Sequence, residues 1–231
     1  MLGIIGAMEE EVKELLDLMQ VESTKEDANY KFYKGMLGNK ETVVVQGGIG
    51  KVNATISATL LVRDFDIDHV INIGTAGGLK PNTEEVGDIV ISEKVVHHDF
   101  DLTGFGRAYG EVPGFGVGFT ADEKLVKLAK EVLDQDHVRA HVGLIASGDQ
   151  FISKKEQVEP MLAHFPDALC AEMEAASIAQ VCTVFKVPFI VTRGLSDIYN
   201  KGSNEVQFDE YLKKAAAVSA KMCYQLAQKL A

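Results

Sequence analysis

The sequence contains no run of 18 or more apolar residues, so we expect no helix that could cross a lipid bilayer. Its first residues also lack the basic segment and the longer apolar segment of a secretory signal. Only three cysteines are present, Cys170, Cys182 and Cys223, and they lie far apart without a CxxC pair. These features favour reduced core thiols and a cytoplasmic location.

Proline and positive charge are also scarce. With 5 prolines and an apolar fraction of 46% in 231 residues, the sequence predicts a globular protein with a sizeable core. The 23 basic residues are outnumbered by 34 acidic ones, which gives a net charge of −11. This balance argues against a nucleic-acid surface, because phosphate neutralisation needs clustered lysine and arginine. It also disfavours multiply anionic substrates.

Short apolar strands alternate with helical periods along the chain. Strands are expected at 2–6, 42–46, 69–74, 86–99, 141–147 and 188–194, with a hairpin before the second. Helices are expected after 2–6, after the glycine loop at 47–50, and near 121–134, 172–185 and 208–231. We therefore predict a single α/β domain over residues 1–231, with three layers and a mixed, mostly parallel central sheet flanked by helices. Sites in such sheets lie beyond the carboxyl ends of strands.

Two nucleotide motifs and one metal motif fail on inspection. A phosphate loop in QGGIGKVNA would need glycine at 45 and a hydroxyl residue at 52, where Val45 and Val52 stand. The dinucleotide fingerprint would need glycine in place of Asn53. His97 and His98 are adjacent on an expected strand and would point to opposite faces. The sequence therefore gives no sign of a phosphate loop, a dinucleotide site or a shared metal ion at these positions.

Three glutamates follow the first strand in GAMEEEV. At about 100° per residue, Glu10 points away from the apolar stripe of its helix, whereas Glu9 and Glu11 flank that stripe. Glu10 is therefore expected in solvent, and both Glu9 and Glu11 remain candidates for a functional carboxylate. Acidic residues in a first turn also simply complement the helix dipole.

Further carboxylates occupy later junctions. Glu172 and Glu174 precede an almost wholly apolar helical stretch, which predicts a buried helix with carboxylates at its mouth. In RGLSD, Asp197 follows a buried strand beside Ser196, with Arg193 near the strand end. Helix capping and Asx turns are the alternative explanations. Separated carboxylates with no metal motif favour acid/base chemistry on an uncharged substrate.

Seven motifs together carry a family resemblance. GIIGAMEEEV, GIGKVNA, INIGTAGGL, VGDIVIS, SGDQFI, AEMEAASIA and LSD occur in the order found in bacterial 5′-methylthioadenosine/S-adenosylhomocysteine nucleosidases, and the chain resembles them over about residues 2 to 230. The resemblance implies a nucleoside phosphorylase-like fold and a homodimer. It also implies hydrolysis of the N-glycosidic bond of 5′-thioadenosines, which needs no cofactor.

The same resemblance assigns roles at the bond that breaks. Asp197 would protonate N7 of adenine and must therefore carry a proton in the complex, with Ser196 orienting it. Glu11 would position and deprotonate the attacking water, with Arg193 nearby. Glu174 would hold the ribose 2′-hydroxyl.

The resemblance also places residues around the rest of the substrate. Met173 would pack under the sugar, and Phe151 would stack on adenine while its backbone and that of Ile152 read the base edge. Thr75 keeps a hydroxyl where related enzymes often have serine. The other expected contacts are Ala76, Gly77 and Glu172 in the site, Met8, Ile49 and Phe208 in the 5′-alkylthio pocket, and Phe105 and Pro113 from the other subunit.

Three alternative functions remain to be weighed. A purine nucleoside phosphorylase of the same superfamily would need basic residues for phosphate, whereas AMEEE is acidic. A nucleosidase acting on an aminofutalosine-like nucleoside would differ in the 5′ pocket. A non-catalytic nucleoside sensor would be expected to lose one of the carboxylates Glu11, Glu174 and Asp197, and all three are present.

Overall fold

The computed structural model describes the backbone of residues 1–201 and 204–231 and the side chains of 1–201 and 211–231. The helices in this part of the chain are α1 (Glu9–Asp17), α2 (Lys51–Asp64), α3 (Glu123–Gln135), α4 (Lys155–His164), α5 (Ala175–Phe185) and α6 (Asn204–Lys229), with a 3-10 turn at Thr103–Phe105. The strands are β1 (Leu2–Gly6), β2 (Met19–Asp27), β3 (Tyr30–Leu37), β4 (Lys40–Gln46), β5 (His69–Asn72), β6 (Thr75–Gly78), β7 (Ile89–His97), β8 (Glu111–Val112), β9 (Gly116–Val117), β10 (Phe119–Thr120), β11 (Ala140–Ser147), β12 (Ala168–Glu172) and β13 (Phe189–Ile198).

One sheet joins eleven of these strands in the order β10-β7-β11-β12-β6-β13-β5-β1-β4-β3-β2. Strand β1 is parallel to both β4 and β5, and β13 is parallel to β5 and β6. The β2–β3–β4 edge is antiparallel, so the sheet is mixed. The register sets Gly6 beside Gln46 and Ile5 beside Asn72, so β1, β4 and β5 end side by side.

Strand β13 pairs with three strands of the sheet. Besides β5 and β6, it pairs antiparallel with β7 through Thr192, Arg193 and Gly194. Since β7, β11, β12 and β6 are already neighbours, this extra pairing closes five strands into a ring. The ring holds β13 on two sides, and every residue of β13 is buried.

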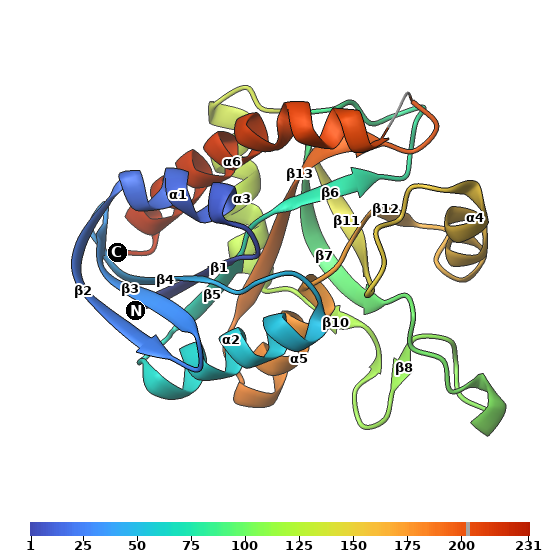
Figure 1. The fold of residues 1–231 in the computed structure, drawn as a ribbon, viewed down its shortest axis with the longest axis horizontal. Coiled ribbons are helices and arrows are strands. Elements are labelled where there is room, and N and C mark those ends of the chain that lie inside the picture. Colours follow the sequence, from blue (N-terminus) through green and yellow to red (C-terminus); the bar gives the residue numbers. More distant parts are fainter. Residues whose placement is uncertain (202–203) are drawn as a thin grey trace.

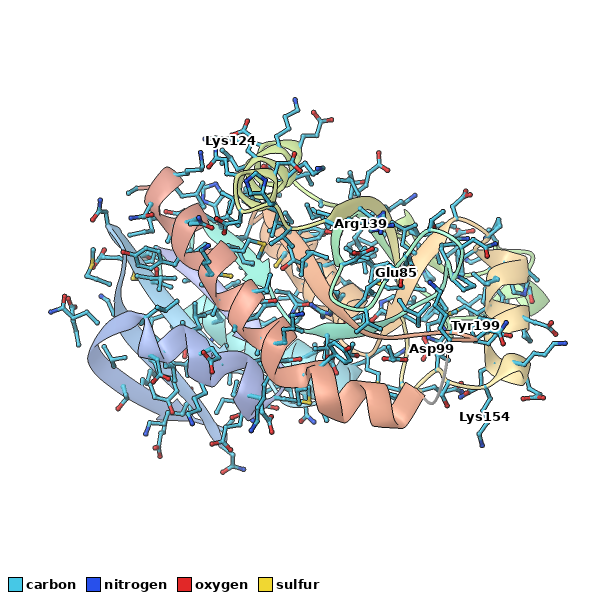
Figure 2. The ribbon with its side chains drawn as sticks, turned by 90° about the horizontal axis from the view of Figure 1, so that it is seen from above. Glu85, Asp99, Lys124, Arg139, Lys154 and Tyr199 are labelled. Carbon is cyan, nitrogen blue, oxygen red and sulfur yellow. The ribbon has the colours of Figure 1, made fainter. Side chains whose placement is uncertain are left out.

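Helices cover both faces of the sheet, as predicted. Figure 1 shows α1, α3 and α6 on one face and α2 and α5 on the other, and Figure 2 looks onto α6 from above. An apolar cluster lies on each face of the sheet, because successive strand residues point to opposite faces. On β1, Ile4 packs in the cluster under α1, α3 and α6, and Ile5 packs in the cluster under α2 and α5. This arrangement confirms the predicted α/β fold class.

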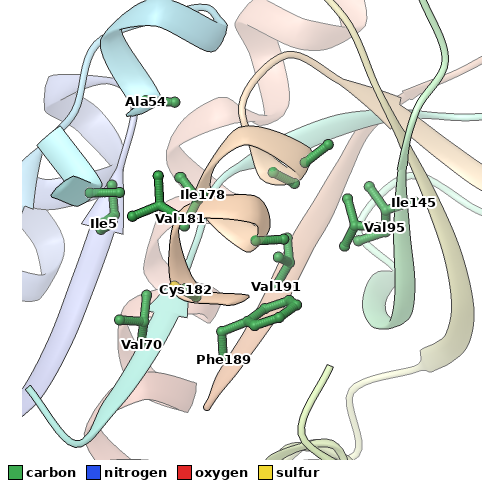
Figure 3. Close-up of a cluster of buried hydrophobic side chains, with 14 of the residues drawn as sticks. Ile5, Ala54, Val70, Val95, Ile145, Ile178, Val181, Cys182, Phe189 and Val191 are labelled. Carbon is green, nitrogen blue, oxygen red and sulfur yellow. The ribbon is translucent and has the colours of Figure 1, made fainter. Parts of the chain in front are cut away.

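Helix α5 is buried on most of its surface. Its Ile178, Val181 and Cys182 point into a cluster with Val70 of β5 and Phe189 of β13 (Figure 3). The three cysteines are free thiols in the core, as the sequence predicts. None of the helices in the described parts of the chain is both long and apolar enough to cross a bilayer.

Several expected boundaries are wrong. The expected helix at 172–185 begins only at Ala175, and Glu172 is the last residue of β12. The expected strand at 188–194 extends to Ile198, so Asp197 lies within β13 and not after it. Helix α4 and strands β2, β6 and β12 were not expected. The glycine-rich sequence TAGG looks like a loop, but pairing with β12 and β13 holds it as a strand.

The buried face of α5 gives a stability prediction. Val181→Ala should lower the free energy of unfolding by about 2 kcal/mol, because it leaves a cavity in the core. Val184→Ala in the same helix should stay within about 0.5 kcal/mol of the wild type. The two valines are 7% and 55% exposed, and both replacements change helix propensity equally. Urea denaturation measures both, and equal effects would contradict this packing.

Candidate active site

A cavity of about 100 Å³ lies between the ends of β1, β12 and β13, strand β6 and the loop before α2. Four of its lining residues are carboxylates, and no lysine, arginine or histidine lines it among the described residues. Wider depressions elsewhere, such as one beside Lys13 and Tyr30, gather no such set of buried acids. The cavity is lined by Ala7, Met8, Glu11, Ile49, Thr75, Ala76, Gly77, Phe151, Ala171, Glu172, Met173, Glu174, Ser196 and Asp197.

Glu11 lies in the first turn of α1, and its carboxylate turns back over the end of β1. Its Oε2 accepts hydrogen bonds from the backbone N–H of Ala7 (2.7 Å) and of Met8 (3.0 Å), and its Oε1 accepts one from Thr75 (3.1 Å). Burial raises the pKa of Glu11, while the charge of Arg193 and the three N–H donors oppose that rise. The carboxylate is thus fixed in orientation before any ligand arrives.

The two glutamates next to it have different surroundings. Glu9 and Glu10 are exposed, whereas Glu11 is 3% exposed. The exposure of Glu10 confirms the expectation from helical geometry. That geometry left Glu9 open, and the structure places it outside the cavity lining, so only Glu11 of the three faces the cavity.

Arg193 is a fully buried cation behind the cavity. Its Nη2 donates to Glu172 Oε2 at 2.6 Å and to the side-chain Oδ1 of Asn72 at 2.6 Å. Its Nη1 donates to the backbone carbonyls of Asn72 (3.3 Å) and Thr192 (3.0 Å). A Cβ at Gly74 would lie 3.3 Å from the guanidinium carbon, so glycine lets this group approach the backbone. Arg193 therefore acts on the cavity by its charge, through the carboxylates around it.

Glu172 and Glu174 both precede α5: Glu172 is the last residue of β12, and Glu174 is the residue before the helix. The Glu172 carboxylate accepts N–H donors from Glu174 (3.1 Å) and Ala175 (2.9 Å) at this helix start. Glu174 Oε1 accepts the backbone N–H of Gly50 at 2.9 Å. Burial and then the negative charge of Glu172 raise the pKa of Glu174 to about 7. At neutral pH the site therefore holds a carboxyl group that both loses and gains its proton readily.

Ser196 and Asp197 are the buried polar residues near the end of β13. Ser196 Oγ donates to Asp197 Oδ1 at 2.8 Å, which fixes the aspartate side chain. A Cβ at Gly77 would lie 3.1 Å from Asp197 Oδ2, and a Cβ at Gly74 would lie 3.1 Å from Glu11 Oε1. The glycines of GTAGG therefore let the carboxylates of Asp197 and Glu11 lie against one stretch of backbone.

The remaining predicted residues divide into four groups. Most line the cavity, namely Met8, Ile49, Thr75, Ala76, Gly77, Phe151 and Met173. Ile152 does not line it and packs in a neighbouring apolar cluster. Phe105 and Pro113 are exposed on a projecting arm at 98–119 and lie outside the lining. The side chain of Phe208 lies outside the described residues.

Sequence reasoning missed Asn72, which holds Arg193 and also donates from its side chain to the carbonyl of Ile5 at 2.9 Å. An amide inside the apolar run VINIG is the signal that could have found it, because a buried polar side chain needs partners. Ala7 and Ala171 were missed too, and small apolar residues give no such signal.

The histidine pair has no role in the cavity. His97 Nε2 lies 3.1 Å from Gln180 Oε1, and the His98 ring lies against Gly148. Among the residues that the structure describes, no group of three or more His, Cys, Asp or Glu side chains is arranged to hold a metal ion. The chemistry that this site can offer is proton transfer and charge stabilisation by four carboxyl groups around a ligand that is not an anion.

Comparison with known proteins agrees with this description. The phosphorylase superfamily model matches residues 1–230, and the fold and site define the chain as a member of that superfamily. A 5′-methylthioadenosine/S-adenosylhomocysteine nucleosidase of Exiguobacterium sp. is 48% identical over 99% of this chain and 97% of its own length. The solved nucleosidase of Neisseria meningitidis, in complex with methylthio-immucillin-A, has a TM-score of 0.93, 39% identity and coverage of 99% of this chain and 98% of its own.

A second solved nucleosidase, from Colwellia psychrerythraea and in complex with adenine, has a TM-score of 0.93 at 41% identity and covers 99% of this chain and 95% of its own. The chain belongs to the family of 5′-methylthioadenosine/S-adenosylhomocysteine nucleosidases. The resemblance seen in the sequence is thereby confirmed.

The raised pKa of Glu174 predicts a pH-dependent stability. A carboxyl with a pKa of about 7 when folded and about 4.5 when unfolded stabilises the fold below pH 4.5, and this stability is lost as the pH rises through 7. Glu174→Gln should therefore gain stability relative to the wild type between about pH 5 and 8, by up to roughly 3 kcal/mol. Denaturant unfolding across this range measures the difference. The exposed Glu156→Gln is the control, and a pH-independent difference for Glu174→Gln would contradict the assignment.

Proposed function

We propose that the protein hydrolyses the N-glycosidic bond of 5′-methylthioadenosine, S-adenosylhomocysteine and 5′-deoxyadenosine, releasing adenine and the corresponding pentose. Residues 1–231 act as one nucleosidase domain. The observation that carries the proposal is a cavity lined by four carboxyl groups and, among the described residues, by no cation. Such a lining suits an uncharged nucleoside and water. In a cell this activity would serve methionine salvage and remove by-products of methyl transfer.

Departure of adenine is assisted from β13. As the bond lengthens, negative charge develops on the purine and positive charge on the ribose. Asp197, oriented by Ser196, donates a proton to N7, so that adenine leaves as a neutral base. Negative charge on the carboxylates around the sugar stabilises the positive ribose.

Attack by water takes place at the opposite side of the sugar. Glu11 holds the water and accepts its proton, because backbone N–H groups fix its carboxylate and Arg193 favours the ionised form. Glu174 holds the ribose 2′-hydroxyl, since a carboxyl that titrates near pH 7 can accept or donate that hydrogen bond. Thr75 lies beside Glu11 on the same side of the sugar, and Met173 packs under the ring.

Recognition of the two ends of the nucleoside falls to different loops. Phe151 stacks on adenine, and the backbone of Phe151 and Ile152 reads its edge. Met8 and Ile49, which line the cavity, contact the 5′-alkylthio group together with Phe208. One solved relative is in complex with adenine and another with methylthio-immucillin-A, which supports a ligand of this kind in the cavity.

A second copy of the chain completes the 5′ pocket in this proposal. Phe105 is 85% exposed on its arm, and Val52 and Ile56 of α2 are exposed as well. A homodimer in which Phe105 and Pro113 of each protomer cover the cavity of its partner would bury these apolar groups. The net charge of −11 and the free core thiols support a cytoplasmic enzyme that binds neither nucleic acid nor membranes.

One assay separates this function from its rivals. Purified protein is incubated with methylthioadenosine, S-adenosylhomocysteine, adenosine and aminofutalosine, each with and without phosphate. From methylthioadenosine and S-adenosylhomocysteine, adenine and a free thiopentose should appear at the same rate with and without phosphate. A phosphate requirement and a sugar 1-phosphate product would make the protein a phosphorylase, and a strong preference for aminofutalosine would assign it to menaquinone synthesis.

The proposed acid and base predict two inactive variants. Asp197→Asn and Glu11→Gln should each lower kcat/KM for methylthioadenosine by about 10³-fold, because each removes a proton-transfer group. The neighbouring exposed Glu10→Gln should stay within about twofold of the wild type. Thermal unfolding checks that the variants are folded. Retention of most activity by either variant would refute this mechanism.

A further inference from the structure

Three charged residues that take no part in the proposed chemistry meet beside the loops that line the cavity. Lys51 ends GIGK at the start of α2, Asp99 follows β7, and Asp149 follows β11. The Lys51 ammonium donates to Asp99 Oδ1 at 2.6 Å, and the Asp149 N–H donates to Asp99 Oδ2 at 3.0 Å. The Lys51 N–H donates to Asp149 Oδ1 at 2.8 Å, which closes a triangle of contacts among three loops.

The glycines of the same motifs show how tightly these loops meet. A Cβ at Gly148 would lie 3.0 Å from Asp99 Cγ and 2.5 Å from His98 Nε2. A Cβ at Gly50 would lie 3.2 Å from Asp149 Oδ1, and the φ of +92° there also favours glycine. GIGK and SGD therefore have glycine where the backbone approaches the carboxylates of the triangle.

The central pair is half-sheltered and ionised. The side chains of Lys51 and Asp99 are each 22% exposed. Burial alone would raise the pKa of Asp99, but the hydrogen bonds from Lys51 and Asp149 outweigh it and lower that pKa. Hydrogen bonds with an ionised partner are shorter and stronger than neutral ones, so this pair can hold two loops together.

Two of the three loops, those of Lys51 and Asp149, also carry a group that faces the cavity. Gly50, next to Lys51, donates its N–H to Glu174 at 2.9 Å. Phe151 lines the cavity two residues after Asp149, and Ile49 lines it two residues before Lys51. We propose that Lys51, Asp99 and Asp149 form a clasp of positioning residues that sets substrate binding by fixing the loops of Ile49 and Phe151. This inference rests on the proposed function.

The clasp should act on binding more than on bond cleavage. Glu11 is fixed by Ala7, Met8 and Thr75, and Asp197 by Ser196, so the acid and the base do not depend on it. Release of the clasp leaves the loops free to sample other positions, and the substrate must then order them again on binding. The expected result is a higher KM with a nearly unchanged kcat.

Two isosteric variants and one matched control test the clasp. Lys51→Met and Asp99→Asn should each raise KM for methylthioadenosine about tenfold and change kcat less than about threefold. The double variant should have about the same KM as the single variant with the higher KM, because both substitutions remove the same contact. Lys25→Met breaks an ion pair of equal length, Lys25–Asp64 at 2.6 Å, that involves no residue of the cavity lining, and it should leave both constants unchanged.

Hydrogen exchange gives a readout that does not depend on activity. Peptides covering 147–153 should exchange faster in Lys51→Met and Asp99→Asn than in the wild type or in Lys25→Met, since the Asp149 N–H loses its fixed acceptor. Unchanged exchange would overturn the clasp itself. Faster exchange with unchanged KM, or a fall in kcat alone, would overturn its role in binding. A wild-type protein that releases no adenine would instead refute the proposed function, and exchange would still decide whether the clasp exists.

Discussion

The buried guanidinium of Arg193 is the constraint on which the site depends. A cation without solvent is tolerated only when ionised and polar partners surround it, and here Glu172 and Asn72 supply them. Burial raises the pKa of the neighbouring Glu174 to about 7, and the negative charge of Glu172, which Arg193 holds in place, adds to that rise. The same cation favours the ionised form of Glu11. One arginine therefore links the three glutamates of the site: it binds Glu172 directly, and its charge opposes the rise that burial causes in the pKa of Glu11 and of Glu174.

The same arrangement explains why water suits this cavity better than phosphate. The charge of Arg193 is already balanced by carboxylates, and the lining offers no other cation among the described residues. An anion entering the cavity would meet uncompensated negative charge. A chain that matches the phosphorylase superfamily model can thus use water, because its cavity offers phosphate no free cation among the described residues.

Local sequence pattern predicted the fold class because apolar periods of two and 3.6 residues are visible along the chain. It failed where long-range pairing decides the structure. TAGG forms strand β6 only because it pairs with β12 and β13. Glu172 is the last residue of β12, and its carboxylate accepts a backbone N–H at the start of α5. Helical periodicity excluded Glu10 as the carboxylate of the site but could not decide between Glu9 and Glu11. That choice depends on the hydrogen bond from Thr75 and the charge of Arg193, which are distant in the sequence. Asn72 went unnoticed because its partner lies far away in the sequence.

Strand β13 has a consequence for how the molecule is made. It lies between β5 and β6, which are separated by only two residues, yet it begins at residue 189, long after β6 ends at residue 78. The two strands are therefore synthesised long before the strand that pairs with both of them. Insertion of β13 closes the ring and delivers Arg193, Ser196 and Asp197 together. The sheet and the cavity are therefore completed by the same strand, so the carboxylate of Asp197 joins the other three carboxylates only when β13 is in place.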